Sequence, residues 1–219
     1  MENLTSRKLK SLSSIFNSSI FSDIMDDMGY KNQMIAGLHP NIEGAKSFGR
    51  ANTLKIRKLK EGEDFRGIYA ALDTYKSVNE GDIIIVENEV FDRAYFGELN
   101  ANLAIRSGAI ASIIGGVTRD AKEVKDLGYP VFAVGYFAQD VRGRATLEGH
   151  NVPITINGVS IKPKDLIFAD INGVAIIPQE IEEKVVTRAI EVIQTEKNII
   201  DKITLGVDAM TIYDEEGAF

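Results

Sequence analysis

Two short polar motifs contain the side chains of this sequence that are best suited to act together in chemistry. Gly97-Glu98-Leu99-Asn100 comes first, and Arg119-Asp120 follows after twenty residues counted from Glu98. Arginine presents a planar fork of N–H donors to an oxo or carboxylate oxygen. Aspartate is a hard oxygen ligand of the kind that Mg²⁺ or Mn²⁺ prefers. These residue types favour a site that binds an oxyanion beside a divalent metal ion.

The elements around Arg119-Asp120 place this pair beyond the end of a strand. Residues 110–114 predict a buried strand, Gly115-Gly116 predicts a loop, and a short helix is expected from Asp120 to Leu127. Ligands of open α/β sheets bind at this end of the strands, and glycines let the backbone approach a ligand closely. The simpler alternative is that Asp120 caps the helix while Arg119 is a surface charge. The spacing alone favours that alternative.

The first motif is placed at the start of a helix expected from Gly97 to Arg106, which Gly108 ends. The N–H groups of a first helical turn have no partner within the helix and suit a carboxylate. The Glu98 side chain could hold a metal-bound water, or it could simply favour the positive end of the helix dipole. Taken alone, this motif is also explained by its structural role.

Strand and helix patterns alternate through the middle of the chain, which predicts an α/β architecture. In chain order these elements are expected at 83–86, 97–106, 110–114, 120–127 and 131–134. Asn157-Gly158 and Asn172-Gly173 each separate two β-rich runs and predict antiparallel hairpins. The four hairpin strands are expected at 152–156, 159–161, 166–169 and 174–177.

Helices are expected on both sides of this region. Ser22 is predicted to cap a helix that Gly29 ends, a second helix is expected near Asp64, and a long one from Pro178 to about Ile200. The inward residues of the last two helices are expected to be Phe65, Ile68 and Leu72, and Ile181, Val185, Ala189, Val192, Ile193 and Ile200. Because no linker divides the chain, we expect one domain over residues 1–219 with a C-terminal helical arm at 179–219.

The composition disfavours several classes of partner and site. The formal net charge is −7, so the chain as a whole repels the phosphate backbone of nucleic acids. There is no cysteine, which excludes disulfides and thiolate metal sites. No run of apolar residues is long enough to span a membrane and no signal segment precedes the helices, so we expect a cytoplasmic protein with no membrane contact.

The two motifs and their surroundings resemble one family. The spacing from Glu98 to Arg119-Asp120 is similar to the signature of the class II 4-hydroxy-4-methyl-2-oxoglutarate aldolases, a family that also includes the regulator of RNase E activity A. Residues 108–120 resemble its strand, loop and helix, and residues 128–133 its next strand. Residues 152–178 resemble its paired hairpins, and the resemblance spans residues 15 to 205.

This resemblance implies a swivelling β/β/α-type domain with a mixed sheet, an antiparallel hairpin unit and helical termini. It implies a homotrimer or a hexamer of two trimers, with the sites between subunits. The backbone of Gly97, Glu98, Leu99 and Asn100 would hold the substrate carboxylate, and Arg119 would hold the 2-oxo group. Asp120 would bind Mg²⁺ or Mn²⁺ directly, and Glu98 would reach the metal through water.

The sequence departs from the family pattern at two positions. Glu98 stands where the family usually has aspartate, and Gly115 stands where it often has aspartate. The longer arm of Glu98 should still reach a metal-bound water. A neighbouring subunit contributes a carboxylate in the family, and Glu196 is our candidate for it.

The activity that the resemblance implies is retro-aldol cleavage of a 4-hydroxy-2-oxo acid to pyruvate, with oxaloacetate decarboxylation as a side activity. Both reactions pass through the pyruvate enolate, whose charge a metal ion and Arg119 would stabilise. A lysine Schiff base is the alternative electron sink. The lysines nearest the signature, Lys122 and Lys125, are expected on a solvent face, which favours metal-dependent, class II chemistry.

Two other functions remain open at this point. The chain could be a binding protein that docks on a nuclease, as the regulators of the family do. Those regulators tend to lack the aspartate after the arginine, so the presence of Asp120 favours an enzyme. An aldolase that acts on a different sugar-derived or aromatic-derived 2-oxo acid is the third possibility, decided by loops such as Gly135 to Asn151.

Overall fold

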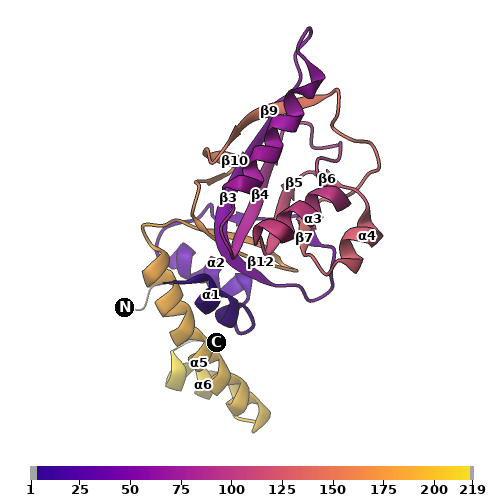
Figure 1. Cartoon of the computed structure of the whole chain (residues 1–219). Coiled ribbons are helices and arrows are strands. Elements are labelled where there is room, and N and C mark those ends of the chain that lie inside the picture. The colour runs from indigo at the N-terminus through magenta and orange to yellow at the C-terminus, as the bar shows by residue number, and fades with distance from the viewer. Residues whose placement is uncertain (1–3, 218–219) are drawn as a thin grey trace.

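A mixed sheet is the central element of the structure, a computed structural model that describes residues 4–217 (Figure 1). Four parallel strands form its middle, namely β3 (Ser47–Lys58), β4 (Asp82–Asn88), β5 (Ala111–Gly115) and β7 (Val131–Ala133). Antiparallel strands extend it, namely β1 (Met34–Ile35), β2 (His39–Pro40), β9 (Ala145–His150), β12 (Leu166–Asp170) and β13 (Gly173–Ile177). The strand order is β1-β13-β12-β3-β4-β5-β7-β2, and β9 pairs with the second half of β3.

Helices and a small hairpin cover the two faces of this sheet. One face carries η1 (Phe65–Lys76), a 3₁₀-helix, and α3 (Glu98–Ser107); the other carries the hairpin of β10 (Ile154–Ile156) and β11 (Val159–Ile161). In β4 the side chains of Ile84 and Val86 pack toward the helices, while those of Ile83 and Ile85 pack toward the hairpin. A continuous apolar strand is what a sheet buried on both faces requires. The layers are therefore β, β and α.

A third apolar cluster lies where three helices pack on β3, β12 and β13. These helices are α1 (Ser6–Ser13), α2 (Ser18–Asp27) and α5 (Glu182–Thr204). Four buried rings meet there with centroids 5.1 to 6.0 Å apart, in tilted and edge-on pairs, namely Phe16, Phe21, Phe48 and Phe168. Figure 1 shows α5 and α6 (Ala209–Glu216) extending away from the sheet at the end opposite β9. The last two positions of the predicted arm lie outside the described residues.

The predicted α/β architecture with its mixed sheet, hairpins and helical C-terminus is confirmed. One expected turn is shifted, because Asp170 pairs with Gly173 and the turn residues are therefore Ile171 and Asn172. The first expected helix is also longer than predicted. α2 begins at Ser18, and the Asn17 side chain accepts a hydrogen bond from the Ile20 N–H, so Ser22 lies inside the helix.

Some residues predicted to face inward are exposed. In η1 the buried side chains of Ile68, Ala71 and Thr74 are three residues apart, which is the period of a 3₁₀-helix. The prediction for Leu72 assumed the α-helical period and is wrong, and Phe65 is exposed as well. Ile200 is also exposed, and its neighbour Ile199 is buried instead.

The sequence patterns did not predict β3, the longest strand of the sheet. Polar residues interrupt its apolar positions, so neither alternation nor a continuous apolar run identifies it. Asn52 is fully buried in this strand, and it accepts a hydrogen bond from Thr74 and donates to Ser77. Only these partners, which come from η1 and the turn after it, make a buried asparagine acceptable in a central strand.

Candidate active site

Three chain segments meet beyond the carboxyl ends of the parallel strands β4, β5 and β7. Phe96 bridges Thr118, and Ala94 bridges Asp140, both in parallel orientation. β6 (Val117–Thr118) and β8 (Gly135–Tyr136) form a further parallel pair. These contacts bring the segments that follow the three strands side by side. Arg119-Asp120 was expected at this end of the strands, where ligands of open α/β sheets bind.

Asp120 does not cap the helix that follows it. It stands at the N-cap position of α4 (Ala121–Asp126), but its side chain makes no capping hydrogen bond. Its Oδ2 instead accepts a hydrogen bond from the backbone N–H of Glu98 at 3.0 Å, across the gap between the two motifs. Its φ of 53° lies in the left-handed region, which non-glycine residues rarely adopt and which is concentrated at functional sites. The capping alternative is therefore excluded for this side chain.

Gly97 is buried directly against the second motif. A Cβ atom at this position would lie 2.3 Å from Asp120 Oδ2 and 3.0 Å from Arg119 Cγ. Its φ of −158° is ordinary extended backbone, so the requirement for glycine comes from space and not from conformation. The two motifs are in van der Waals contact at this point.

Arg119 is held between two carboxylates. Its Nη1 lies 2.9 Å from Asp140 Oδ2, and its Nε lies 3.6 Å from Asp120 Oδ2. The other oxygen of Asp140 accepts the backbone N–H of Arg142 at 2.6 Å. Because Asp120 and Asp140 are each held by a backbone N–H, the guanidinium between them has a defined orientation, unlike a free surface arginine.

Asp140 was not predicted from the sequence. It lies in a loop with no helical or strand period. Backbone pairing of this loop, of Asp140 with Ala94 and of Phe137 with Thr118, brings it to Arg119. An acidic residue two positions before the Arg142-Gly143-Arg144 cluster is the one local signal, and it is weak, because such charge patterns are usually solvated.

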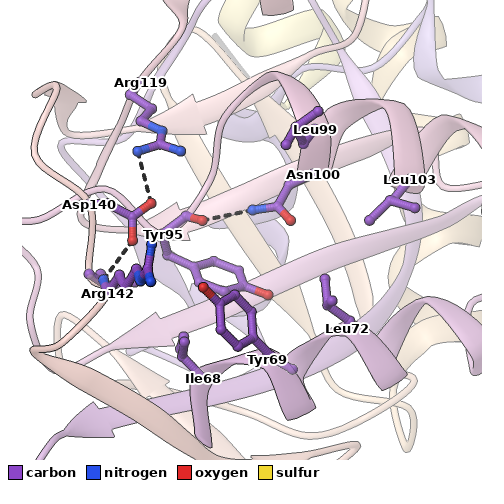
Figure 2. Close-up of a pocket in the computed structure, with 12 residues that line it drawn as sticks. Ile68, Tyr69, Leu72, Tyr95, Leu99, Asn100, Leu103, Arg119, Asp140 and Arg142 are labelled. Atoms are coloured by element: carbon purple, nitrogen blue, oxygen red, sulfur yellow. Dashed lines mark hydrogen bonds and ion pairs between the residues drawn. The ribbon is translucent and has the colours of Figure 1, made fainter. Parts of the chain in front are cut away.

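Two hollows flank Arg119. One of about 530 Å³ lies between η1 and α3 and is lined by Arg119, Asp140 and mainly apolar side chains (Figure 2). The other, of about 330 Å³, is lined by Arg119, Asp120, Tyr136, Phe137 and Ala138. Arg119 therefore contributes to both, and a ligand bound to it has space on either side.

The remaining predicted site residues lie at different distances from Arg119 in the fold: some line a hollow beside it and others line neither hollow. The Asn100 amide donates to the Tyr95 carbonyl at 2.7 Å, and Asn100 lines the larger hollow together with Leu99 (Figure 2). Glu98 is exposed and lines neither hollow, although its N–H is bound to Asp120. Glu196 is exposed on α5. The substrate and metal roles of these residues stay predictions.

The sequence matches a known family over most of its length. The model of the RraA-like family, described as Aldolase/RraA, matches residues 19–176. This chain belongs to the RraA-like family. The match contains both polar motifs and the hairpins, as the resemblance predicted.

Individual relatives of this RraA-like chain are distant. Protein DlpA of Legionella pneumophila is 31% identical over 87% of this chain, but the match spans only 31% of that longer relative. A protein of Halalkalibacterium halodurans named "Putative 4-hydroxy-4-methyl-2-oxoglutarate aldolase" is 27% identical, over 78% of this chain and 77% of its own length. The solved structure of a protein from Pseudomonas syringae pv. tomato has a TM-score of 0.82 at 26% identity and covers 97% of this chain and 99% of its own.

Two structural findings bear on partners. Within residues 4–217, no three histidine, aspartate or glutamate side chains are grouped so that they could hold a metal ion by themselves. No helix in the described part of the chain is long and apolar enough to cross a membrane.

Proposed function

We propose that this protein cleaves a 4-hydroxy-2-oxo acid, of the 4-hydroxy-4-methyl-2-oxoglutarate type, by a metal-dependent retro-aldol reaction that releases pyruvate. The observation that carries the proposal is the contact between the two motifs. Asp120 accepts the Glu98 N–H, and Arg119 is fixed beside it at the edge of two hollows. The name of the Halalkalibacterium relative supports the same reaction class.

The residues present fit a divalent metal ion of the Mg²⁺ or Mn²⁺ type. Asp120 offers a carboxylate that is about one-third exposed and lines the smaller hollow. Mg²⁺ is commonly held by one or two carboxylates, with water and substrate oxygens as its other ligands. Asp120 would therefore hold the ion directly, and Glu98 would act through a water molecule. A bound ion would supply Lewis-acid stabilisation of the 2-oxo oxygen.

The chain's own residues would act on the developing charge. Loss of the proton from the C4 hydroxyl forms a carbonyl at C4 as the C3–C4 bond breaks, and the electron pair passes to C3 as an enolate. The negative charge gathers on the C2 oxygen, which a guanidinium anchored through Nε and Nη1 can contact with its Nη2 N–H groups. Protonation of C3 then gives pyruvate. Asp140 positions Arg119 for this contact.

The direct test measures pyruvate release from oxaloacetate and from 4-hydroxy-4-methyl-2-oxoglutarate with Mg²⁺ present, and again after EDTA. We expect pyruvate release from both compounds, because decarboxylation of oxaloacetate and aldol cleavage form the same enolate. We expect EDTA to abolish this release, because the proposed metal ion stabilises that enolate. Absence of pyruvate from every compound would overturn the proposed reaction. Release that is indifferent to EDTA would overturn its metal dependence alone.

The contact at Gly97 gives a prediction with a local cause. Gly97→Ala should displace Asp120 and Arg119, because the new Cβ would overlap Asp120 Oδ2. We expect kcat/KM for pyruvate release to fall by about a hundredfold, the scale of an ångström-sized misplacement. Gly135→Ala is the matched control, since a Cβ there meets nothing within 4 Å. Equal activity of the two variants would contradict the proposed importance of this contact for activity.

Docking on a nuclease is the second candidate function, favoured by the family description, which names RraA beside aldolase. Retention of a purified ribonuclease E on the immobilised protein, with no pyruvate release, would select it. For the enzyme we also propose a cytoplasmic homotrimer or hexamer, without nucleic acid or membrane as partner, in which Glu196 of a neighbouring copy completes the site. Mass measurement in solution tests the assembly.

A further inference from the structure

The larger hollow beside Arg119 is apolar over most of its wall. It has a volume of about 530 Å³, which lies within the range typical of small-molecule pockets. Its apolar and aromatic lining residues come from η1, α3 and the segments that follow β4 and β7. They are Ile68, Tyr69, Ala71, Leu72, Tyr95, Leu99, Leu103 and Val141.

The charges of this hollow are gathered at one end. Figure 2 shows Arg119, Asp140 and Arg142 together, with Leu72 and Leu103 on the side away from them. Asp140 is engaged by Arg119 and by the Arg142 backbone, so its charge is neutralised locally. No further acidic or basic side chain lines the hollow among the described residues. This distribution of charged and apolar side chains suits a ligand with an anionic group at Arg119 and an apolar remainder.

Several lining side chains are exposed although they are apolar. Leu72 is 45% exposed, Tyr69 49% and Leu99 77%, and all three line the same hollow, whereas exposed apolar residues are ordinarily scattered. The Tyr95 hydroxyl behind them is buried and has no hydrogen-bond partner among the described residues. Burial raises the pKa of Tyr95 further above its ordinary value, so its hydroxyl is neutral.

We propose that this hollow binds the C4 substituent of the substrate and that the substituent is apolar or aromatic and not a carboxylate. The inference rests on the proposed function, because it places the 2-oxo acid end of the substrate at Arg119. It also narrows that function: 4-hydroxy-4-methyl-2-oxoglutarate, which carries a carboxylate on C4, is expected to be cleaved but to be a poorer substrate than a compound with an apolar C4 substituent. A carboxylate placed against Leu72 and Leu103 would lie on the apolar side of the hollow, away from Arg119 and Arg142, at a large desolvation cost. The substrate class is R–CH(OH)–CH₂–CO–COO⁻ with an aryl or alkyl R.

The reaction on this class is balanced without another reactant. The C3–C4 bond breaks, the C4 hydroxyl loses its proton and becomes the aldehyde R–CHO, and C3 gains a proton in pyruvate. The aldehyde carries R and leaves from the hollow between η1 and α3. No oxidant or reductant takes part.

The kinetic test compares three substrates that differ only at C4, namely 4-hydroxy-2-oxo-4-phenylbutanoate, 4-hydroxy-2-oxopentanoate and 4-hydroxy-2-oxoglutarate. We expect kcat/KM for the phenyl compound to exceed that for the carboxylate by about a hundredfold, since several carbon groups are buried and each contributes. Leu72→Asn should lower the phenyl value by about tenfold and the methyl value by a smaller factor, because a methyl group contacts less of the apolar wall. Leu205→Asn, on an 81% exposed leucine outside the hollow, is the matched control.

A binding test is independent of turnover. 4-Phenyl-2-oxobutanoate lacks the C4 hydroxyl and cannot be cleaved. We expect calorimetry to show that it binds about tenfold more tightly than 2-oxoglutarate, and that Leu72→Asn removes this difference.

The outcomes separate this inference from the proposed function. Pyruvate release with a preference for the carboxylate substrate overturns the apolar subsite but leaves the lyase activity standing. Binding of the phenyl compound that depends on Leu72, without pyruvate release, supports the subsite and overturns the lyase activity. Weak binding of both compounds overturns the subsite. A change of subunit number in Leu72→Asn, with ligand affinity unchanged, would assign the hollow to contact with a second copy and overturn it too.

Discussion

Arg119→Ala is expected to lower kcat/KM for pyruvate release by about a hundred- to a thousandfold, the usual cost of removing one donor to a developing oxyanion. The guanidinium is oriented by Asp140 at 2.9 Å and by Asp120 at 3.6 Å, so it can meet charge on the C2 oxygen without rearranging. Most of the loss should fall on kcat, because the charge on this oxygen is largest in the transition state. Initial rates over a range of oxaloacetate concentrations measure both constants.

Two further arginine variants make this result interpretable. Arg119→Lys keeps the charge but not the planar fork, and it should recover only a part of the activity. Arg188→Ala removes an arginine that pairs with Asp27 on the far helices, and it should leave kcat/KM unchanged. Full activity in Arg119→Ala would contradict the assignment, as would an equal loss in Arg188→Ala.

Asp120→Ala is expected to abolish the response of the activity to Mg²⁺ and to lower kcat/KM by at least about a hundredfold, because it removes the proposed direct metal ligand. Titration of the EDTA-treated protein with Mg²⁺ measures the response. The substitution also removes the acceptor of the Glu98 N–H, so part of the loss could be structural.

Asp120→Asn separates these two effects. The amide oxygen still accepts the Glu98 N–H, but the negative charge is gone. Retained thermal stability together with a much weaker apparent affinity for Mg²⁺ is the expected result. Asp126→Ala, on the same helix and paired with Lys122 in solvent, is the control for an acidic residue outside the site. Unchanged Mg²⁺ dependence in Asp120→Asn would contradict the metal assignment.

Glu98 is the position at which this chain departs from the signature. In the structure its backbone makes a contact with the second motif, whereas its side chain does not line either hollow. The backbone N–H contacts Asp120, and that contact is independent of side-chain type. The side chain is exposed and lines neither hollow. An additional methylene is therefore tolerated within one copy, and the proposed water-mediated role would depend on what faces Glu98 in the proposed homo-oligomer.

Local sequence patterns predicted the elements that are set by the types of a few neighbouring residues. The continuous apolar run 83–86 predicts a strand buried on both faces, and that is its position in β4. Gly108 ends α3 in the left-handed conformation, and Asn157-Gly158 forms the hairpin turn, because few other residues adopt these angles. The two polar motifs were identified in the same way, from residue type and position.

Tertiary structure decided the features that depend on partners distant in sequence. β3 is central in spite of its polar residues, because η1 and the turn after it satisfy Asn52. The 3₁₀ period of η1 turns Leu72 outward to the edge of the larger hollow. Asp140 reaches Arg119 through the pairing of loops after different strands.

The sequence alone determined the α/β class, the hairpins and the two motifs, since each depends on interactions over a few residues. Whether those motifs come into contact was decided only by the tertiary structure. The parallel order of β4, β5 and β7 brings their following segments together, and the absence of a side chain at Gly97 lets Asp120 reach the Glu98 N–H. No local pattern encodes that contact, because strand order and loop pairing are properties of the whole sheet.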